Sequence, residues 1–379
     1  MSAVASGLDG LVVAQTSLSS VDGTNGILKY RGYNVDDLVN KVTFEEIAYL
    51  IWYGALPTRT QLDELNAKLA ARRAMPGNMK EIISSLPTTG APIDSLKIGV
   101  TVLAMLDEDA DNWEHDALVD KAISATALFP TVLAAYERHR KGKEILAPQP
   151  DLSTAGNFLY MVNGTRPSDT MTAAFDTYLM LLAEHSMNAS TFTARSTISS
   201  STDYYSATNS AIGSLKGIAH GGANMMAMLM LMEVGDPDKI TEFVDESLRT
   251  KRRLMGIGHR IYKTRDPRVN HLMAWSEKIA AEVGDNTWYE LAHRMEELTN
   301  HHPYFIERGL YPNVEFYSAP LLYNLGFEPD LMPGVFALSR IVGWSANLME
   351  QVEANRLMRP QAEYTGPFSQ EFVSIDQRN

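Results

Sequence analysis

The stretch of residues 43–62, TFEEIAYLIWYGALPTRTQL, contains one complete helix and the beginning of a second. Thr43 and Glu46 have the spacing of a capping box, which satisfies free amides at the start of a helix. The apolar positions and the helix-ending residues that follow are Ile47, Leu50, Ile51, Gly54 and Pro57. A second apolar face is then formed by Leu62, Leu65 and Leu69, and Arg72 and Arg73 stand where cations oppose the negative end of a helix. The stretch therefore predicts two consecutive amphipathic helices.

Helical periodicity also dominates the rest of the chain. Further helices are predicted at 94–106, 120–138, 170–187, 223–234, 238–255, 269–282, 286–300 and 333–354. Strand-like alternation is scarce, with short candidates at 10–15 and 27–30. No period of about 20 to 50 residues recurs, which disfavours a helical solenoid. We predict a mainly α, globular fold.

The length of the chain predicts more than one domain. It has 379 residues, which exceeds the roughly 250 to 300 at which a single core usually stops growing. Turn-rich breaks at 142–151, 161–168, 255–258 and 308–313 separate the helices, but none of them is a long linker. We therefore expect a second domain built from the middle of the chain, with an active site in the cleft between the domains.

The composition excludes several classes of protein and of site. The 46 Asp and Glu outnumber the 33 Lys and Arg, and the net charge of −13 argues against nucleic acid as a partner. The absence of cysteine excludes disulfides, thiolate metal sites and a cysteine nucleophile. The N-terminus has no targeting pattern, and the longest apolar run, Met225–Met232, is far shorter than the ~20 residues of a membrane span. We expect a cytoplasmic protein that does not contact a membrane.

One segment is basic in spite of the acidic balance. Residues 251–268, KRRLMGIGHRIYKTRDPR, contain seven Lys or Arg and one acid, Asp266. Gly256 and Gly258 let the backbone turn tightly and present its amides and carbonyls to a ligand. Phosphate binding together with recognition by the main chain indicates a nucleotide-like group. A solvated basic helix face is the alternative interpretation.

Two histidines stand in notable contexts. His220, in GIAHGGAN at 217–224, precedes a Met-rich helix, where the positive helix end favours a neutral imidazole that can donate to an oxyanion. His185, in AEHSMNAS at 183–190, lies at the end of the helix predicted at 170–187. A structural histidine is the alternative for both. The nine histidines form no HExxH pattern and no GxSxG is present, so neither a metal site nor a serine hydrolase is predicted.

Beyond these separate features, seven blocks together resemble the citrate synthase family from one end of the chain to the other. The first two are GLDGLVVAQTSLSSVDGTNGILKYRGYNVDDL at 7–38 and FEEIAYLIWYGALPTRTQL at 44–62. The others, in the family's order and at compatible spacings, are GIAHGGAN, GIGHRIYKTRDPR, PNVEFYSAPLLY, SRIVGWSANLMEQ and RPQAEYTG. The resemblance implies condensation of an acyl-CoA, such as acetyl-CoA, with oxaloacetate, and thioester hydrolysis to citrate and CoA.

The resemblance also assigns the catalytic side chains. His220 would hydrogen-bond the thioester oxygen and stabilise the enolate. His259 would hold the oxaloacetate carbonyl and supply a proton. Glu315, in Asn313-Val-Glu, would be the general base, although most members of the family have Asp at this position. A smaller departure is Asn347, where many bacterial relatives have His.

Substrate contacts follow from the same resemblance. The groups that would bind oxaloacetate are His185, Arg268, Arg340 and Arg359, with Arg72 as a looser match, and a guanidinium suits a two-oxygen acceptor. Arg359 would come from the partner subunit, so a homodimer is implied. The coenzyme A site would consist of Leu254, Met255, Gly256, Ile257, Gly258 and Lys263, with Lys251, Arg252 and Arg265 nearby. No cofactor is held permanently, the CoA thioester is a co-substrate, and no metal is implied.

The fold implied by the family is almost all α and has two domains. Residues 1–219 and 320–379 would form the large domain and residues 220–319 a smaller, mobile one that closes over oxaloacetate. A 2-methylcitrate synthase that uses propionyl-CoA, or one enzyme with both activities, is an alternative within the family. A non-catalytic CoA-binding or scaffolding relative and a histidine metalloenzyme are alternatives from other classes.

Overall fold

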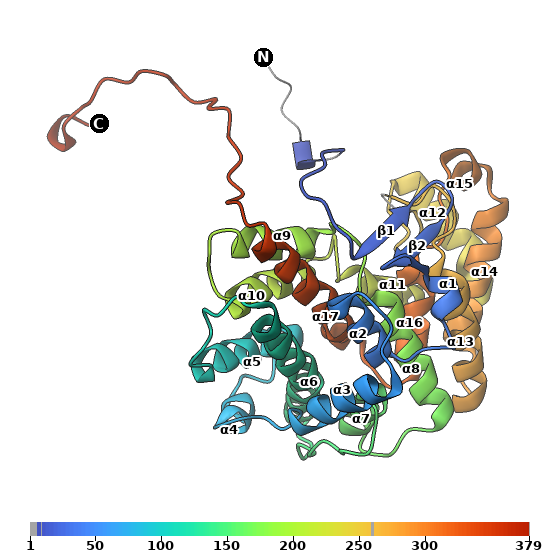
Figure 1. The fold of residues 1–379 in the computed structure, drawn as a ribbon. Coiled ribbons are helices and arrows are strands. Elements are labelled where there is room, and N and C mark those ends of the chain that lie inside the picture. The colour runs from blue at the N-terminus through green and yellow to red at the C-terminus, as the bar shows by residue number, and fades with distance from the viewer. Residues whose placement is uncertain (1–5, 9, 259–260, 379) are drawn as a thin grey trace.

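The computed structural model describes residues 6–8, 10–258 and 261–378. The fold is mainly α (Figure 1), as predicted. The helices are α1 (Val35–Leu38), α2 (Phe44–Tyr53), α3 (Arg59–Ala71), α4 (Met79–Ser84), α5 (Ile93–Leu106), α6 (His115–Arg140), α7 (Thr154–Asn163), α8 (Asp169–Leu182), α9 (Ala189–Ile198), α10 (Tyr204–Leu215), α11 (Ala223–Val234), α12 (Ile240–Thr250), α13 (Arg268–Val283), α14 (Thr287–His301), α15 (Pro303–Arg308), α16 (Val314–Asn324) and α17 (Met332–Glu353). Short 3-10 helices are η1 (Ser6–Leu8), η2 (Pro237–Lys239), η3 (Pro329–Leu331) and η4 (Ile375–Gln377). One antiparallel sheet has the order β1 (Ser19–Asp22), β2 (Ile27–Tyr30) and β3 (Tyr33–Asn34).

The two helices predicted from 43–62 form as their local signals require. Thr43 and Glu46 make both hydrogen bonds of the capping box at the start of α2, and Gly54 ends it with a left-handed φ of 85°. Thr58 and Gln61 repeat the capping box at the start of α3. The apolar faces of α2 and α3 are buried, so the sequence interpretation of this region is confirmed.

Two long helices, α6 and α17, form the centre of the fold. Nearly every residue of α17 is buried, and α6 packs against α5, α7 and α17 (Figure 1). Within the described residues, α6 is the one helix whose length and composition would let it cross a membrane, but 83% of its apolar window is buried inside the protein. A core helix has this pattern of burial. The rigid centre provided by α17 becomes important below, because this helix carries Arg340.

Several sequence predictions were wrong. Residues 10–15 are not a strand, because they pair with no strand in the part of the chain that the structure describes, and the sheet uses 19–22 instead. The helices not foreseen are α1, α4, α7, α9, α10, α15 and α16. For α9 and α10 the reason is composition: both are rich in Ser and Thr, which lower helix propensity and blur the apolar stripe. Their N-caps, Asn188 and Asp203, were the signal available in the sequence.

Helix α8 also ends earlier than predicted, at Leu182 rather than 187. Its final carbonyls are satisfied from outside the helix, since Tyr30 Oη donates to Leu181 O, Arg340 Nε to Leu182 O, and the Gly343 amide to Ala183 O. Residues 183–188 consequently leave the helix as an irregular segment. This segment presents Glu184 to α17 and His185 to Tyr262.

The turn between β1 and β2 contacts the segment at 261–265. The Lys263 amide donates to Gly23 O at 2.8 Å. A Cβ on Gly23 would overlap the Ile261 carbonyl, and one on Gly26 would approach Thr264 and Arg265 closely. The hairpin therefore fixes part of the basic segment in place.

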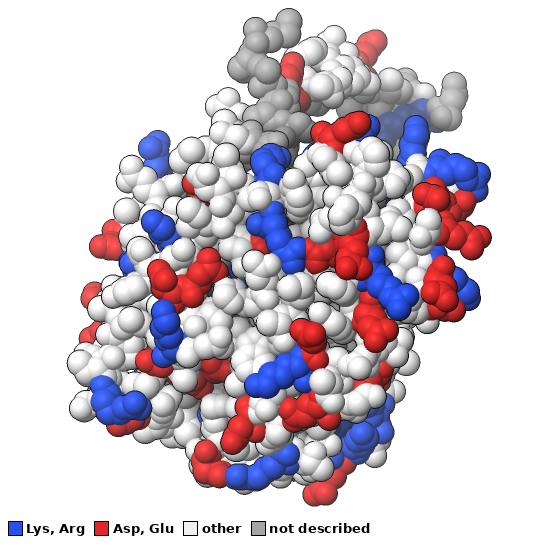
Figure 2. All heavy atoms as spheres, turned by 90° about the vertical axis from the view of Figure 1, so that its right-hand side faces the viewer, with Lys and Arg blue, Asp and Glu red and all other residues white. Residues whose placement is uncertain are grey.

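The face formed by α13, α14 and α15 is polar and of mixed sign. Lys and Arg side chains lie among Asp and Glu across it (Figure 2). The excess of acidic residues is therefore not gathered into one patch on this face.

Candidate active site

Arg340 is a buried cation on α17. It is 2% exposed, its Nε donates to Leu182 O at 2.8 Å, and its guanidinium lies 4.8 Å from the centroid of the Phe336 ring. Burial lowers the pKa of Arg340 to about 10, although Glu184 opposes the shift. Arg340 forms no ion pair with any residue in the described ranges. A buried arginine without an ion-pair partner is suited to bind an anionic ligand.

Arg268 begins α13 and is held by an acid two residues before it. Its Nε and Nη2 donate to the two carboxylate oxygens of Asp266 at 2.9 and 2.6 Å, and its amide donates to Oδ1. Burial alone would lower the pKa of Arg268, but Asp266 raises it above its ordinary value. The guanidinium is thus fixed in orientation, and the sequence analysis did not identify Asp266 as its partner.

His185 contacts the basic segment through Tyr262. Its Nε2 lies 3.1 Å from Tyr262 Oη, and the two rings meet edge to face with centroids 5.6 Å apart. His185 is buried, and burial raises the pKa of Tyr262 while the nearby charge of Arg268 opposes that shift. His185 therefore lies in the same buried region as Arg268 and Arg340.

His220 lies in the loop between α10 and α11. Its Nε2 accepts the Ser190 amide at 3.3 Å and lies 2.8 Å from Ser190 Oγ, and Trp344 Nε1 donates to that same Oγ. Because Nε2 acts as an acceptor, the neutral ring carries its proton on Nδ1. Burial, followed by the charge of Arg340, lowers the pKa of His220 to about 4. The predicted neutral imidazole is confirmed, but its main cause is burial rather than the helix end.

Glu315 is the second residue of α16, and its side chain is partly exposed although its Oε2 atom is buried. Its Oε2 has no hydrogen-bond partner among residues 6–8, 10–258 and 261–378. Burial raises the pKa of Glu315, while Arg268 and Arg340 oppose the shift. A buried carboxylate oxygen that is left unpaired, with a raised pKa, is suited to accept a proton from a substrate.

The segment 254–258 is bonded to the loop that leads into Glu315. Gly258 donates to Tyr311 O at 2.7 Å, and Gly256 O accepts the Asn313 amide at 2.9 Å. Asn313 Nδ2 donates to Gly258 O at 3.2 Å. Both glycines have left-handed φ values, of 80° and 87°, and a Cβ on either would press on Phe316 or Leu310. The predicted coenzyme A segment and the candidate base therefore belong to one connected unit.

A cavity of about 620 Å³ lies beside this segment. It combines cations with apolar and aromatic side chains, and its lining includes Lys251, Arg252, Arg253, Leu254, Tyr304 and Phe305. Arg252 pairs with Glu233 at the surface, and Arg265 pairs with Glu296 on α14, away from the cavity lining. This mixture of groups suits a ligand with phosphates and a flat ring.

Two predicted residues of the described part of the chain, Arg72 and Arg359, lie apart from this group. Arg72 caps α3 and bonds Asp120 and Ser124 on α6. These contacts are structural, and none of them reaches His185, Arg268 or Arg340. Arg359 is exposed on the C-terminal segment beyond α17. His259 lies outside the described residues.

Comparison with known proteins identifies the family. The family described as "Citrate synthase, C-terminal domain" matches residues 7–361. The chain belongs to the citrate synthase family. It is 41% identical to citrate synthase 2 of Bacillus subtilis, over 98% of both chains, and 37% identical to 2-methylcitrate synthase 1 of Corynebacterium glutamicum, over 100% of this chain and 99% of the other.

A solved citrate synthase has the same fold. The ternary complex of the Thermoplasma acidophilum enzyme with carboxymethyl coenzyme A and oxaloacetate superimposes with a TM-score of 0.93, at 31% identity and 99% coverage of each chain. The resemblance found in the sequence and the citrate-synthase-like, mainly α fold are thus confirmed. As a citrate synthase family acyltransferase, the protein uses a coenzyme A thioester as substrate and needs no metal. No group of three His, Asp or Glu that could hold a metal lies in the described part of the chain.

Replacement of Gly343 by alanine is expected to destabilise the protein. A Cβ at this position on α17 would overlap Glu184 Oε2 and the Ala183 carbonyl. Overpacking of this kind costs about 1 to 3 kcal/mol of unfolding free energy. Urea denaturation of Gly343→Ala measures the loss, with Gly156→Ala on α7 as the control, because a Cβ there meets its neighbours at ordinary contact distances of 3.4 Å or more. Equal midpoints for the two variants would contradict the close packing at Gly343.

Proposed function

We propose that the protein condenses acetyl-CoA with oxaloacetate and hydrolyses the resulting thioester, which gives citrate and free CoA. The observation that carries this proposal is the unpaired, buried carboxylate oxygen of Glu315, within reach of the charges of Arg268 and Arg340. A base can accept the proton of a carbon acid, and two buried cations beside it can bind a dicarboxylate next to that carbon acid. The site combines both kinds of group.

Oxaloacetate is bound through its two carboxylates. Arg340 has no acidic partner of its own in the described residues, and Arg268 is oriented by Asp266, so both guanidinium groups are ready for anions. His185 adds a polar group held by Tyr262. Together these side chains fix the oxaloacetate carbonyl for attack.

Proton removal then generates the nucleophile. The Glu315 carboxylate takes a proton from the α-carbon of acetyl-CoA, and His220 donates a hydrogen bond from Nδ1 to the thioester oxygen, on which negative charge develops. Because the neutral ring of His220 is held by Ser190, whose Oγ is in turn bonded by Trp344 Nε1, its donor is oriented before the substrate arrives.

The enolate carbon attacks the oxaloacetate carbonyl carbon, a carbon–carbon bond forms, and the carbonyl oxygen takes a proton. His259 is our assignment for that proton, by its place in the family motif. Water then cleaves the thioester, and the products are a tricarboxylate and the CoA thiol. Closure of a small domain at 220–319 over a large one at 1–219 and 320–379 would exclude bulk water until condensation has occurred.

Coenzyme A is proposed to bind in the 620 Å³ cavity and along residues 254–258. The backbone of this segment would face the adenine, and the cations at the cavity rim and Lys263 would face the phosphates. Since the same segment is hydrogen-bonded to the loop before Glu315, binding of CoA would also support the position of the base.

A homodimer is proposed from the C-terminal segment. This segment leaves the body of the protein after α17 (Figure 1), and it exposes Leu357, Tyr364, Phe368, Phe372 and Ile375. Apolar side chains exposed to this extent, 90% for Phe368, are suited to contact a second copy of the chain. Arg359 on this segment would then reach the oxaloacetate site of the partner subunit.

Release of CoA thiol with oxaloacetate tests the function, and the chain contributes no thiol background because it has no cysteine. We expect turnover with acetyl-CoA. The identity to a 2-methylcitrate synthase makes propionyl-CoA the second candidate, and one methyl group in an apolar pocket changes specificity by only about 10- to 200-fold. Comparable kcat/KM for the two acyl-CoAs would support dual use, and a difference above about 1,000-fold would exclude it. Absence of thiol release with either would contradict the proposed function.

A further inference from the structure

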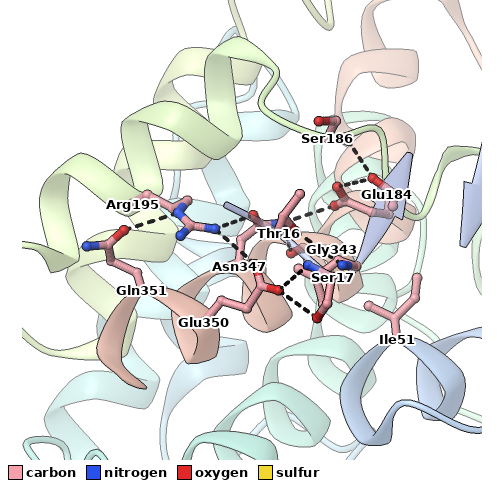
Figure 3. Close-up of polar contacts among 12 residues, drawn as sticks. Thr16, Ser17, Ile51, Glu184, Ser186, Arg195, Gly343, Asn347, Glu350 and Gln351 are labelled. Atoms are coloured by element: carbon pink, nitrogen blue, oxygen red, sulfur yellow. Dashed lines mark hydrogen bonds and ion pairs between the residues drawn. The ribbon is translucent and has the colours of Figure 1, made fainter. Parts of the chain in front are cut away.

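A buried polar network joins the oxaloacetate site to the N-terminal segment, and Glu184 lies at its inner end (Figure 3). Glu184 accepts hydrogen bonds from Ser19 Oγ at 3.1 Å and from Asn347 Nδ2 at 3.2 Å. Asn347 Oδ1 accepts in turn from Arg195, which pairs with Glu350. The amide of Asn347 is therefore fixed with its donor side toward Glu184. The reaction proposed above uses none of these contacts.

The network is attached directly to the helix that carries Arg340. Arg340, Gly343 and Asn347 are spaced three and four residues apart, so they share one face of α17. Segment 182–184 lies on this face, because Leu182 O accepts from Arg340 and Ala183 O accepts from Gly343. The Glu184 carboxyl thus lies beside Gly343, which is three residues along α17 from Arg340.

The two buried charges influence each other. The negative charge of Glu184 acts to raise the pKa of Arg340, and the positive charge of Arg340 acts to lower the pKa of Glu184. The charge of Glu184 offsets that of Arg340 although the two side chains form no ion pair, so the site without substrate is close to charge balance. An incoming dicarboxylate disturbs that balance, because it places further negative charge beside Arg340.

We propose that Glu184 is a positioning residue of the oxaloacetate site, that it balances the charge of Arg340 when the site is empty, and that it takes up a proton when oxaloacetate binds. This inference rests on the proposed function. The other charged and titratable groups around Glu184 are His185 on its own segment, Tyr30 on β2, Arg340 and Glu350 on α17, Arg195 on α9, and Arg268 beyond Arg340.

The direction in which pH changes oxaloacetate affinity follows from the linkage between proton binding and oxaloacetate binding. Burial, offset by Arg340 and by the bonds from Ser19 and Asn347, raises the pKa of Glu184 to about 7 in the empty site. Tyr30 and Arg340, with pKa values of about 12 and about 10, stay protonated to pH 8.5, and His220, at about 4, stays neutral. Bound oxaloacetate stabilises the protonated form of Glu184, so affinity is higher below pH 7 and decreases as pH rises through that value.

Isothermal titration calorimetry with oxaloacetate, in buffers of different ionisation enthalpy and without acyl-CoA, tests the inference. For the wild type we expect net proton uptake near pH 7.5 and up to about tenfold weaker binding between pH 6.5 and 8.5. Glu184→Gln keeps the shape and can keep both hydrogen bonds, with the one to Ser19 reversed, but it cannot titrate. We expect this variant to bind oxaloacetate with little pH dependence and no uptake.

Glu350→Gln is the matched control, because it removes a carboxylate at the outer end of the same network. Proton uptake by this variant should equal that of the wild type. Uptake that persists in Glu184→Gln would assign the proton to another group of the site, His185 or Glu315, and overturn the inference, as would binding by the wild type without uptake. If Glu184→Gln does not fold, Ser19→Ala is the variant to use, because it removes one hydrogen bond to the Glu184 carboxylate. Proton uptake should then move to higher pH. An unchanged pH profile of proton uptake would overturn the inference. Wild-type protein that binds no oxaloacetate would overturn the proposed function as well.

Discussion

Replacement of Glu315 by glutamine is expected to lower kcat for thiol release by about 10²- to 10⁴-fold, the usual contribution of a general base. The amide occupies the same space but cannot accept the α-proton of the acyl-CoA. Oxaloacetate binding should change little, because Arg268 and Arg340 remain. Steady-state thiol release measures the first effect, and calorimetry with oxaloacetate alone measures the second.

The matched control is Glu307→Gln on α15, which removes a carboxylate outside the site and should leave kcat unchanged. The pH profile adds a second criterion. Since burial raises the pKa of Glu315, the wild-type kcat should fall on the acid side at a pH above the ordinary value for glutamate, about 4.3. Turnover by Glu315→Gln at the wild-type rate would show that the base lies elsewhere.

Glu315→Asp tests how the longer side chain is accommodated. The family resemblance implies aspartate at this position in most members, and we expect the backbone of α16 to be set back to fit the longer glutamate. A shift of the carboxylate by about 1 Å can reduce turnover by roughly 100-fold. We therefore expect Glu315→Asp to be slower than the wild type and faster than Glu315→Gln.

The sequence predicted the helices whose ends carry explicit signals. Thr43 with Glu46 and Gly54 define α2 without help from the rest of the fold, because capping and helix termination are local. Helices α9 and α10 were missed since their Ser and Thr residues become helical only through packing against each other and α17. Local propensity is a weak guide where tertiary contacts determine the structure.

The site residues divide in a similar way. His220, Glu315, Arg268 and Arg340 could be named because each lies in a distinctive block of sequence. Ser190 and Glu184 could not, because their roles depend on neighbours far along the chain: Ser190 is 30 residues from His220, and Glu184 is 163 from Asn347. Only the fold brings such partners together.

Asp266 is a further case, and it alters how the oxaloacetate site should be tested. Arg268→Leu is expected to weaken oxaloacetate binding by at least about 30-fold, because it removes a buried partner of a carboxylate. It should also destabilise the protein by about 3 to 5 kcal/mol, because Asp266 is left as an uncompensated buried charge. A loss of activity in this single variant could therefore arise from either effect.

The double variant Asp266→Asn/Arg268→Leu separates the two effects. Removal of the unpaired Asp266 carboxylate should recover most of the lost unfolding free energy, measured by urea denaturation, because no buried charge then remains unpaired. Oxaloacetate binding should stay as weak as in Arg268→Leu, since the guanidinium is still missing. If the double variant instead regained oxaloacetate affinity together with stability, Arg268 would be a structural partner of Asp266, and Arg340 with His185 would have to bind the substrate without it.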